Sequence, residues 1–105
     1  MQEKHTRRWR IAQSKENVFW KRDGVLASQM ERVLSRYASV ISEVSEILEP
    51  HHRILDVGCG PTCVGRLFNV GIKTYLDPLM DSYIKEFPEK LPEGEMLCGV
   101  AEKIP

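Results

Sequence analysis

The stretch that decides the fold is His52–Val64, HRILDVGCGPTCV. It opens with a short apolar run that carries one acidic residue, Asp56, and then breaks into the glycines Gly58 and Gly60. A short apolar run bounded by glycine is typical of a buried β-strand that enters a tight turn. We expect a helix after the turn. This arrangement of strand, turn and helix would let the backbone approach a ligand closely and aim free N–H groups at it.

Upstream of this stretch, residues 25–48 carry the clearest helical pattern. Apolar residues recur there at intervals of three and four, which is the spacing of one helix face. They are Leu26, Met30, Val33, Leu34, Tyr37, Ile41, Val44 and Leu48. Pro50 follows, and a residue before a proline is biased away from helix, so we expect a helix over 25–48 that packs against the core.

Downstream of the glycine turn, short apolar runs alternate with polar segments. We expect a helix over 64–69, a strand over 72–76, a helix over 79–87, a loop over 88–94 and a strand over 95–98. Strands that alternate with helices at this spacing form a parallel sheet with crossover helices. The sequence therefore predicts an α/β fold whose residues 53–98 form a three-stranded βαβαβ unit.

Residues 1–24 form a separate arm with a basic bias and the aromatic residues Trp9, Phe19 and Trp20. We expect a solvated helical arm in which Trp20 packs against the domain formed by residues 25–105. The alternative is that the basic arm binds an acidic substrate or partner.

The composition is that of an ordinary soluble domain, with 42% hydrophobic and 29% charged residues. Basic and acidic residues number 15 each, and the zero net charge argues against nucleic acid or an anionic membrane as a partner. No apolar run reaches the ~18 residues of a membrane span, and the charged amino terminus lacks the apolar stretch of a secretory signal. Three cysteines without disulfide spacing predict reduced thiols and a cytoplasmic location.

In open α/β sheets, ligands bind at the carboxyl ends of the strands. The second predicted strand ends at Asp77, whose carboxylate can accept hydrogen bonds from both hydroxyls of a ribose. The alternative role of Asp77 is to cap the following helix, because Pro78 suits a first helical position. After the third strand, Glu102 can accept from an exocyclic amine, and the N–H of Ala101 can serve a ring nitrogen.

The negative charge of Asp56 helps to decide which kind of nucleotide the glycine turn would bind. A glycine turn usually indicates a dinucleotide site, written GxGxxG, but Cys63 occupies the position of the third glycine. A carboxylate just before the turn repels a pyrophosphate and attracts an ammonium group. The pattern therefore favours a nucleoside that carries an amino acid over a dinucleotide.

Three motifs, ILDVGCGP at 54–61, YLDP at 75–78 and GVAEKIP at 99–105, resemble in order and spacing the first three motifs of the class I S-adenosylmethionine-dependent methyltransferases. The resemblance covers about Leu26–Pro105 and implies a three-layer, Rossmann-like sheet that binds S-adenosylmethionine. Asp56 and the glycines would hold the methionine part, Asp77 the ribose, and the remaining residues the adenine. The cofactor-binding residues so implied are Asp56, Gly58, Cys59, Gly60, Asp77, Pro78, Leu79, Ala101 and Glu102.

The chain departs from this family in three places. Thr62 replaces a small residue, and Val100 replaces a frequent Asp, so we expect weaker cofactor binding than in a full-motif member. The family's sheet has seven strands, whereas this sequence ends after three. We therefore expect the cofactor-binding half of a methyltransferase, inactive alone, with catalytic residues and methyl acceptor unidentified. The unpaired edge of strand 53–57 predicts a homodimer through Arg53–Val57.

Two alternatives to a methyltransferase stay open. One is a nicotinamide-dinucleotide-binding oxidoreductase domain, and the other is a non-catalytic module that binds S-adenosylmethionine or a partner protein.

The cysteines also raise the question of zinc. Cys59, Cys63 and Cys98 with His51 or His52 would make a tetrahedral set. The glycine turn leaves no room for an ion beside a ligand, so we expect semi-buried thiols, surface histidines and no metal site.

Overall fold

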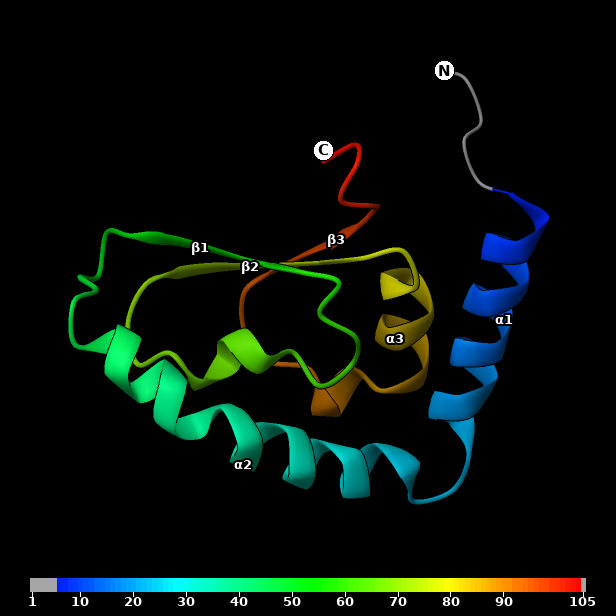
Figure 1. Cartoon of the computed structure of the whole chain (residues 1–105), viewed down its shortest axis with the longest axis horizontal. Coiled ribbons are helices and arrows are strands. Elements are labelled where there is room, and N and C mark those ends of the chain that lie inside the picture. Colours follow the sequence, from blue (N-terminus) through cyan, green and yellow to red (C-terminus); the bar gives the residue numbers. More distant parts are fainter. Residues whose placement is uncertain (1–5, 105) are drawn as a thin grey trace.

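A computed structural model of the chain describes residues 6–104, which form two long helices followed by a small sheet (Figure 1). The helices are α1 (Arg7–Lys21), α2 (Val25–Ser45) and α3 (Met80–Glu86). The strands are β1 (Arg53–Val57), β2 (Ile72–Asp77) and β3 (Glu95–Cys98). Two short 3-10 helices, η1 (Val64–Leu67) and η2 (Pro88–Lys90), lie in the connections. Residues 1–5 of the predicted arm, and Pro105, lie outside the described residues.

The sheet has the order β1-β2-β3, and both strand pairs are parallel. Asp56 lies opposite Tyr75, and Tyr75 lies opposite Met96, so these side chains share one face of the sheet. The prediction of an α/β fold with three parallel strands is confirmed. β2 is one residue longer than predicted and includes Asp77.

The predicted arm and helix are separated by a backbone turn at Gly24. Its φ of 75° lies in the left-handed region, which glycine adopts without a side-chain clash. α2 then begins as expected but ends at Ser45, three residues early. The N–H groups of Ile47 and Leu48 bond to carbonyls only three residues back, which tightens the chain out of the α-helix.

The predicted short helix over 64–69 forms as the 3-10 helix η1, which is two residues shorter and is not an α-helix. Cys63, just before it, has a left-handed φ of 47°, which an α-helix does not continue from. The N–H of Gly65 bonds to the side chain of Asp56 instead of a helical carbonyl. The first crossover is therefore a short turn anchored to β1. α3 is also shorter than predicted by one residue at each end.

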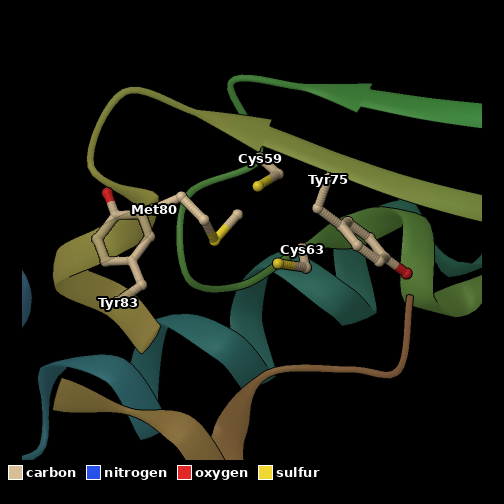
Figure 2. Packing of buried hydrophobic residues seen from close by; sticks show 5 residues of the cluster. All are labelled: Cys59, Cys63, Tyr75, Met80 and Tyr83. Carbon is tan, nitrogen blue, oxygen red and sulfur yellow. The ribbon is translucent and has the colours of Figure 1, made fainter. Parts of the chain in front are cut away.

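The core lies beneath the glycine turn. Figure 2 shows the sulfur atoms of Cys59, Cys63 and Met80 gathered between the rings of Tyr75 and Tyr83, and all five residues are buried. Partly buried hydrophobic residues surround this cluster: Trp20, Leu79, Phe87, Leu91 and Met96. The prediction that Trp20 anchors the arm by packing is confirmed.

Within residues 6–104, helices cover only one face of the sheet. α2 and α3 lie on the same side in Figure 1. On the opposite face, Leu55, Val57 and Ile72 remain 42%, 44% and 52% exposed, although Leu76 between the outer strands is buried. Residues 6–104 thus form two layers where the sequence predicts three. Parallel sheets are normally covered on both faces, so this apolar face and the open edge of β1 are available for association.

We expect the chain to self-associate through β1 and the exposed face beside it. The substitution Leu55→Lys places a charge on that face and should shift the chain toward monomer. Ile47→Lys is the matched control, because Ile47 is 77% exposed but lies in the turn after α2. Sedimentation velocity over a range of concentrations measures both. A wild-type chain that stays monomeric throughout would contradict the expectation.

Candidate functional site

The carboxyl ends of β1 and β2 bring Asp56, the glycine turn and Asp77 together at one edge of the sheet. The N–H groups of Gly58 and Cys59 donate to the carbonyl of Leu76 at 2.7 and 3.2 Å. The N–H of Gly60 donates to Oδ2 of Asp77 at 2.9 Å. The turn is therefore bonded to the end of β2 along its length.

Glycine is required at two positions of this turn. Gly58 and Gly60 have φ values of 65° and 57°, in the left-handed region. A Cβ atom added at either position would meet nothing within 4 Å. The requirement is thus conformational, and open space lies beside the turn where a ligand can approach the backbone.

We expected the turn to present free N–H groups to a ligand, but four of its backbone N–H groups already donate within the molecule. Gly58, Cys59 and Gly60 donate within the molecule, as does Cys63, whose N–H bonds to the carbonyl of Cys59 at 3.1 Å. No α-helix starts after the turn, so it has no helical amino terminus of the kind that binds phosphate. The polar groups directed at this edge are instead carboxylates.

Asp77 organises the edge. Its Oδ2 accepts from Gly60, and its Oδ1 accepts from the N–H of Leu79 at 2.9 Å, while the residue is only 4% exposed. Its carbonyl accepts from the N–H of Gly99 at 3.3 Å, which ties in the segment after β3. The bond to Leu79 closes a local turn before α3, and the alternative role of Asp77 as the helix cap is wrong, because α3 begins at Met80 and has no side-chain cap. Each carboxylate oxygen keeps a second lone pair.

Asp56 is half-buried, and its Oδ2 accepts the N–H of Gly65 at 2.9 Å. Burial raises the pKa of Asp56 above the usual 3.8, the Gly65 bond lowers it, and the charge of Asp77 raises it further. A Cβ atom at Gly65 would lie 3.2 Å from that carboxylate oxygen and from the Tyr75 ring. Gly65 is therefore a third glycine of the site, which the sequence pattern missed because it lies two positions beyond Cys63.

The raised pKa of Asp56 has a consequence for stability. The folded chain binds this proton more tightly than the unfolded chain, so its contribution is fully present below pH 3.8 and is lost as pH rises through the folded pKa. Asp56→Asn does not titrate and keeps an oxygen for the Gly65 N–H. Urea unfolding should show wild type losing stability relative to this variant as pH rises from 3.8 through the raised pKa of Asp56. A difference independent of pH would contradict this.

The other predicted site residues lie beside this edge. Pro78 and Leu79 are half-buried in the link from β2 to α3. Ala101 and Glu102 occupy the exposed tip of a turn closed by the N–H of Lys103 on the carbonyl of Val100 at 3.1 Å. The structure therefore places Asp56, the glycines and Asp77 at one edge of the sheet, with Ala101 and Glu102 on the turn after β3.

Tyr83 is a site neighbour that the sequence did not indicate. Its hydroxyl is buried beside the link between β2 and α3, near Asp77, but no group within residues 6–104 meets the geometry of a hydrogen bond to it (Figure 2). Burial, and then the charge of Asp77, raise the pKa of this phenol. The only sequence signal was an aromatic residue one turn into the helix after Asp77.

Cys59 and Cys63 are free, buried thiols beneath the turn. The S–H of Cys63 donates to the carbonyl of Gly60 at 3.3 Å. A hydrogen bond between the two thiols raises the pKa of Cys59 and lowers that of Cys63. Both residues pack in the core beneath the turn.

Two surface hollows lie elsewhere, along α1 and at the α1–α2 junction, and neither is lined by a predicted site residue.

None of the helices within residues 6–104 has the length and apolarity needed to cross a membrane. Comparisons of the chain with protein-family models, with curated proteins and with solved structures find no match.

Proposed function

We propose that this chain binds S-adenosylmethionine at the carboxyl edge of a Rossmann-like sheet and supplies the cofactor-binding part of a methyltransferase. The proposal is supported by the three motifs in order and by the meeting of Asp56, the glycine turn and Asp77 at one edge. We also propose a cytoplasmic location, because free thiols persist in a reducing compartment.

The observation that carries the proposal is the pair of carboxylates beside the turn. Asp56 is half-buried, and the neighbouring charge that raises its pKa is another carboxylate, Asp77. Holding a carboxylate ionised in such a place costs stability, and groups with perturbed pKa values cluster at functional sites. A ligand with an ammonium and a sulfonium group would relieve that cost.

Other features of this edge support the proposal. Open space lies beside Gly58 and Gly60, so the methionine part can approach the backbone there. Asp77 has spare lone pairs for ribose hydroxyls, and the proposal requires the link to Leu79 to open, because Asp77 is only 4% exposed. Pro78 and Leu79 offer apolar surface for adenine, and Glu102 offers an acceptor for its amine.

When bound, S-adenosylmethionine supplies the transferable methyl group. This chain's residues bind and orient it, which is the protein's main contribution with such cofactors. Asp56 pairs with the ammonium group, Asp77 fixes the ribose, and Tyr83 lies where its hydroxyl can donate to Asp77.

The test is calorimetric titration with S-adenosylhomocysteine, which shares the nucleoside and amino-acid parts, compared with NAD. We expect S-adenosylhomocysteine to bind and NAD to give no response, because Asp56 repels a pyrophosphate and no helix amino terminus follows the turn. Asp56→Asn should fold and lose the binding. Tight NAD binding alone would favour an oxidoreductase domain, and no response to either ligand would favour a partner-binding module.

A further inference from the structure

The turn between α2 and β1 gathers side chains that the proposed cofactor site does not use. Residues Glu49–His52 form this turn, and two hydrogen bonds close it. The N–H of His52 donates to the carbonyl of Glu49 at 3.0 Å, and the N–H of Glu49 donates to Nδ1 of His52 at 2.9 Å. Pro50 further restricts the backbone. The turn is therefore held in one shape before any ligand binds.

Three metal-ligating side chains converge on this turn. Glu49, His51 and His52 each offer one ligand atom, and these atoms all lie within 4.8 Å of one another. The two imidazole rings lie with centroids 4.5 Å apart. Glu49 and His51 are exposed and His52 is half-buried, so an ion can reach the group from solvent.

We propose that Glu49, His51 and His52 bind a divalent transition-metal ion, for which zinc is the natural probe. Two imidazoles and one carboxylate form a known zinc ligand set that leaves a fourth position for water. The nearby carboxyl end of α2 adds the negative end of a helix dipole, which also favours a cation.

Binding through Nδ1 of His52 would change one hydrogen bond of the turn. Nδ1 of His52 now accepts from the N–H of Glu49, and a zinc ion bound at this nitrogen takes the same lone pair. The freed N–H is exposed and can bond to water, so the exchange costs little. The bond between the N–H of His52 and the carbonyl of Glu49 remains to hold the turn.

The cysteines cannot complete this site. His51 and His52 precede β1, whereas Cys59 and Cys63 follow it. Five residues of extended strand, at about 3.3 Å each, separate the two groups by roughly 16 Å. The thiol–imidazole zinc set considered from the sequence is thus excluded by distance, and the new site is also remote from the proposed cofactor site.

A bound ion would connect the end of α2 to the start of β1. The folded turn holds the three ligands in place, whereas the unfolded chain must order them to bind an ion, so binding should raise the temperature of unfolding. The ion at this site stabilises the junction between helix and sheet, independently of any cofactor.

Calorimetric titration of the whole chain with zinc tests the proposal. We expect one ion per chain and affinity at least about tenfold weaker in His51→Ala and in Glu49→Gln. Glu46→Gln is the matched control, because it removes an exposed carboxylate from the end of α2 outside the cluster. Zinc should also raise the midpoint of thermal unfolding in wild type and Glu46→Gln, and not in His51→Ala.

Absence of zinc binding would overturn the proposal, as would equal affinity in the wild type and all three variants, which would place the zinc outside this turn. Circular dichroism verifies that each variant is folded. Titration with S-adenosylhomocysteine in the same variants should be unchanged, so failure here and failure of the proposed cofactor function are distinguishable.

Discussion

Replacing Asp77 by alanine is expected to lower the unfolding free energy by about 3 kcal/mol or more and to abolish S-adenosylhomocysteine binding. The carboxylate accepts the N–H groups of Gly60 and Leu79, and both bonds would be lost. Hydrogen bonds to a charged group contribute about 1.5–3 kcal/mol each, and the buried N–H of Gly60 would have no replacement acceptor. Asp77→Asn should be intermediate, because its amide offers one acceptor oxygen and not two.

Asp81→Ala is the matched control for this substitution. Asp81 is exposed in the first turn of α3, so its loss removes one carboxylate nearby and about 0.3–1 kcal/mol of helix-dipole interaction. Urea unfolding monitored by circular dichroism measures the three variants. If Asp77→Ala were as stable as Asp81→Ala, the organising role of Asp77 would be wrong.

Gly58→Ala should reduce binding of S-adenosylhomocysteine by at least about tenfold, equivalent to 1.4 kcal/mol. Its Cβ would enter the open space beside the turn, where we place the methionine part of the cofactor. The left-handed φ of 65° adds a stability cost of about 1–2 kcal/mol.

Gly24→Ala separates these two effects. Gly24 is exposed, has a φ of 75°, and would also place its Cβ in open space, but it lies between α1 and α2. Both variants should therefore lose similar stability, while only Gly58→Ala loses binding in calorimetry. Equal binding by the two variants would contradict the position of the cofactor beside Gly58.

The strands were predictable because their signals are local. An apolar run that ends in glycine fixed β1, and a similar run ending in Asp-Pro fixed β2. The parallel pairing of the three strands followed from the alternation of strand and helical segments along the chain. The placement of Asp56, the glycine turn and Asp77 at one edge followed as well, because the carboxyl ends of parallel strands meet there.

What the sequence missed depends on bonds between distant residues. The segment after the turn has helical spacing, but the carboxylate of Asp56 takes the N–H of Gly65 and fixes a 3-10 turn. Likewise, Gly60 donates to Asp77, 17 residues away, so the turn is closed from β2. No local pattern reports either bond.

The same limit applies to side chains that meet only in the fold. The hydroxyl of Tyr83 lies beside the β2–α3 link because α3 folds back under the sheet. His51 and His52 were expected to be unrelated surface residues, and their meeting with Glu49 depends on a turn held by hydrogen bonds.

The measurement that tests the central claim most directly is an NMR titration of the chain with S-adenosylhomocysteine, followed at backbone amides. We predict that the signals of Gly58, Gly60 and Leu79 shift together and saturate, while those of Gly24 and His51 do not move. No shift at the carboxyl edge of the sheet with about 1 mM ligand, which would place any dissociation constant above the millimolar range, would contradict it.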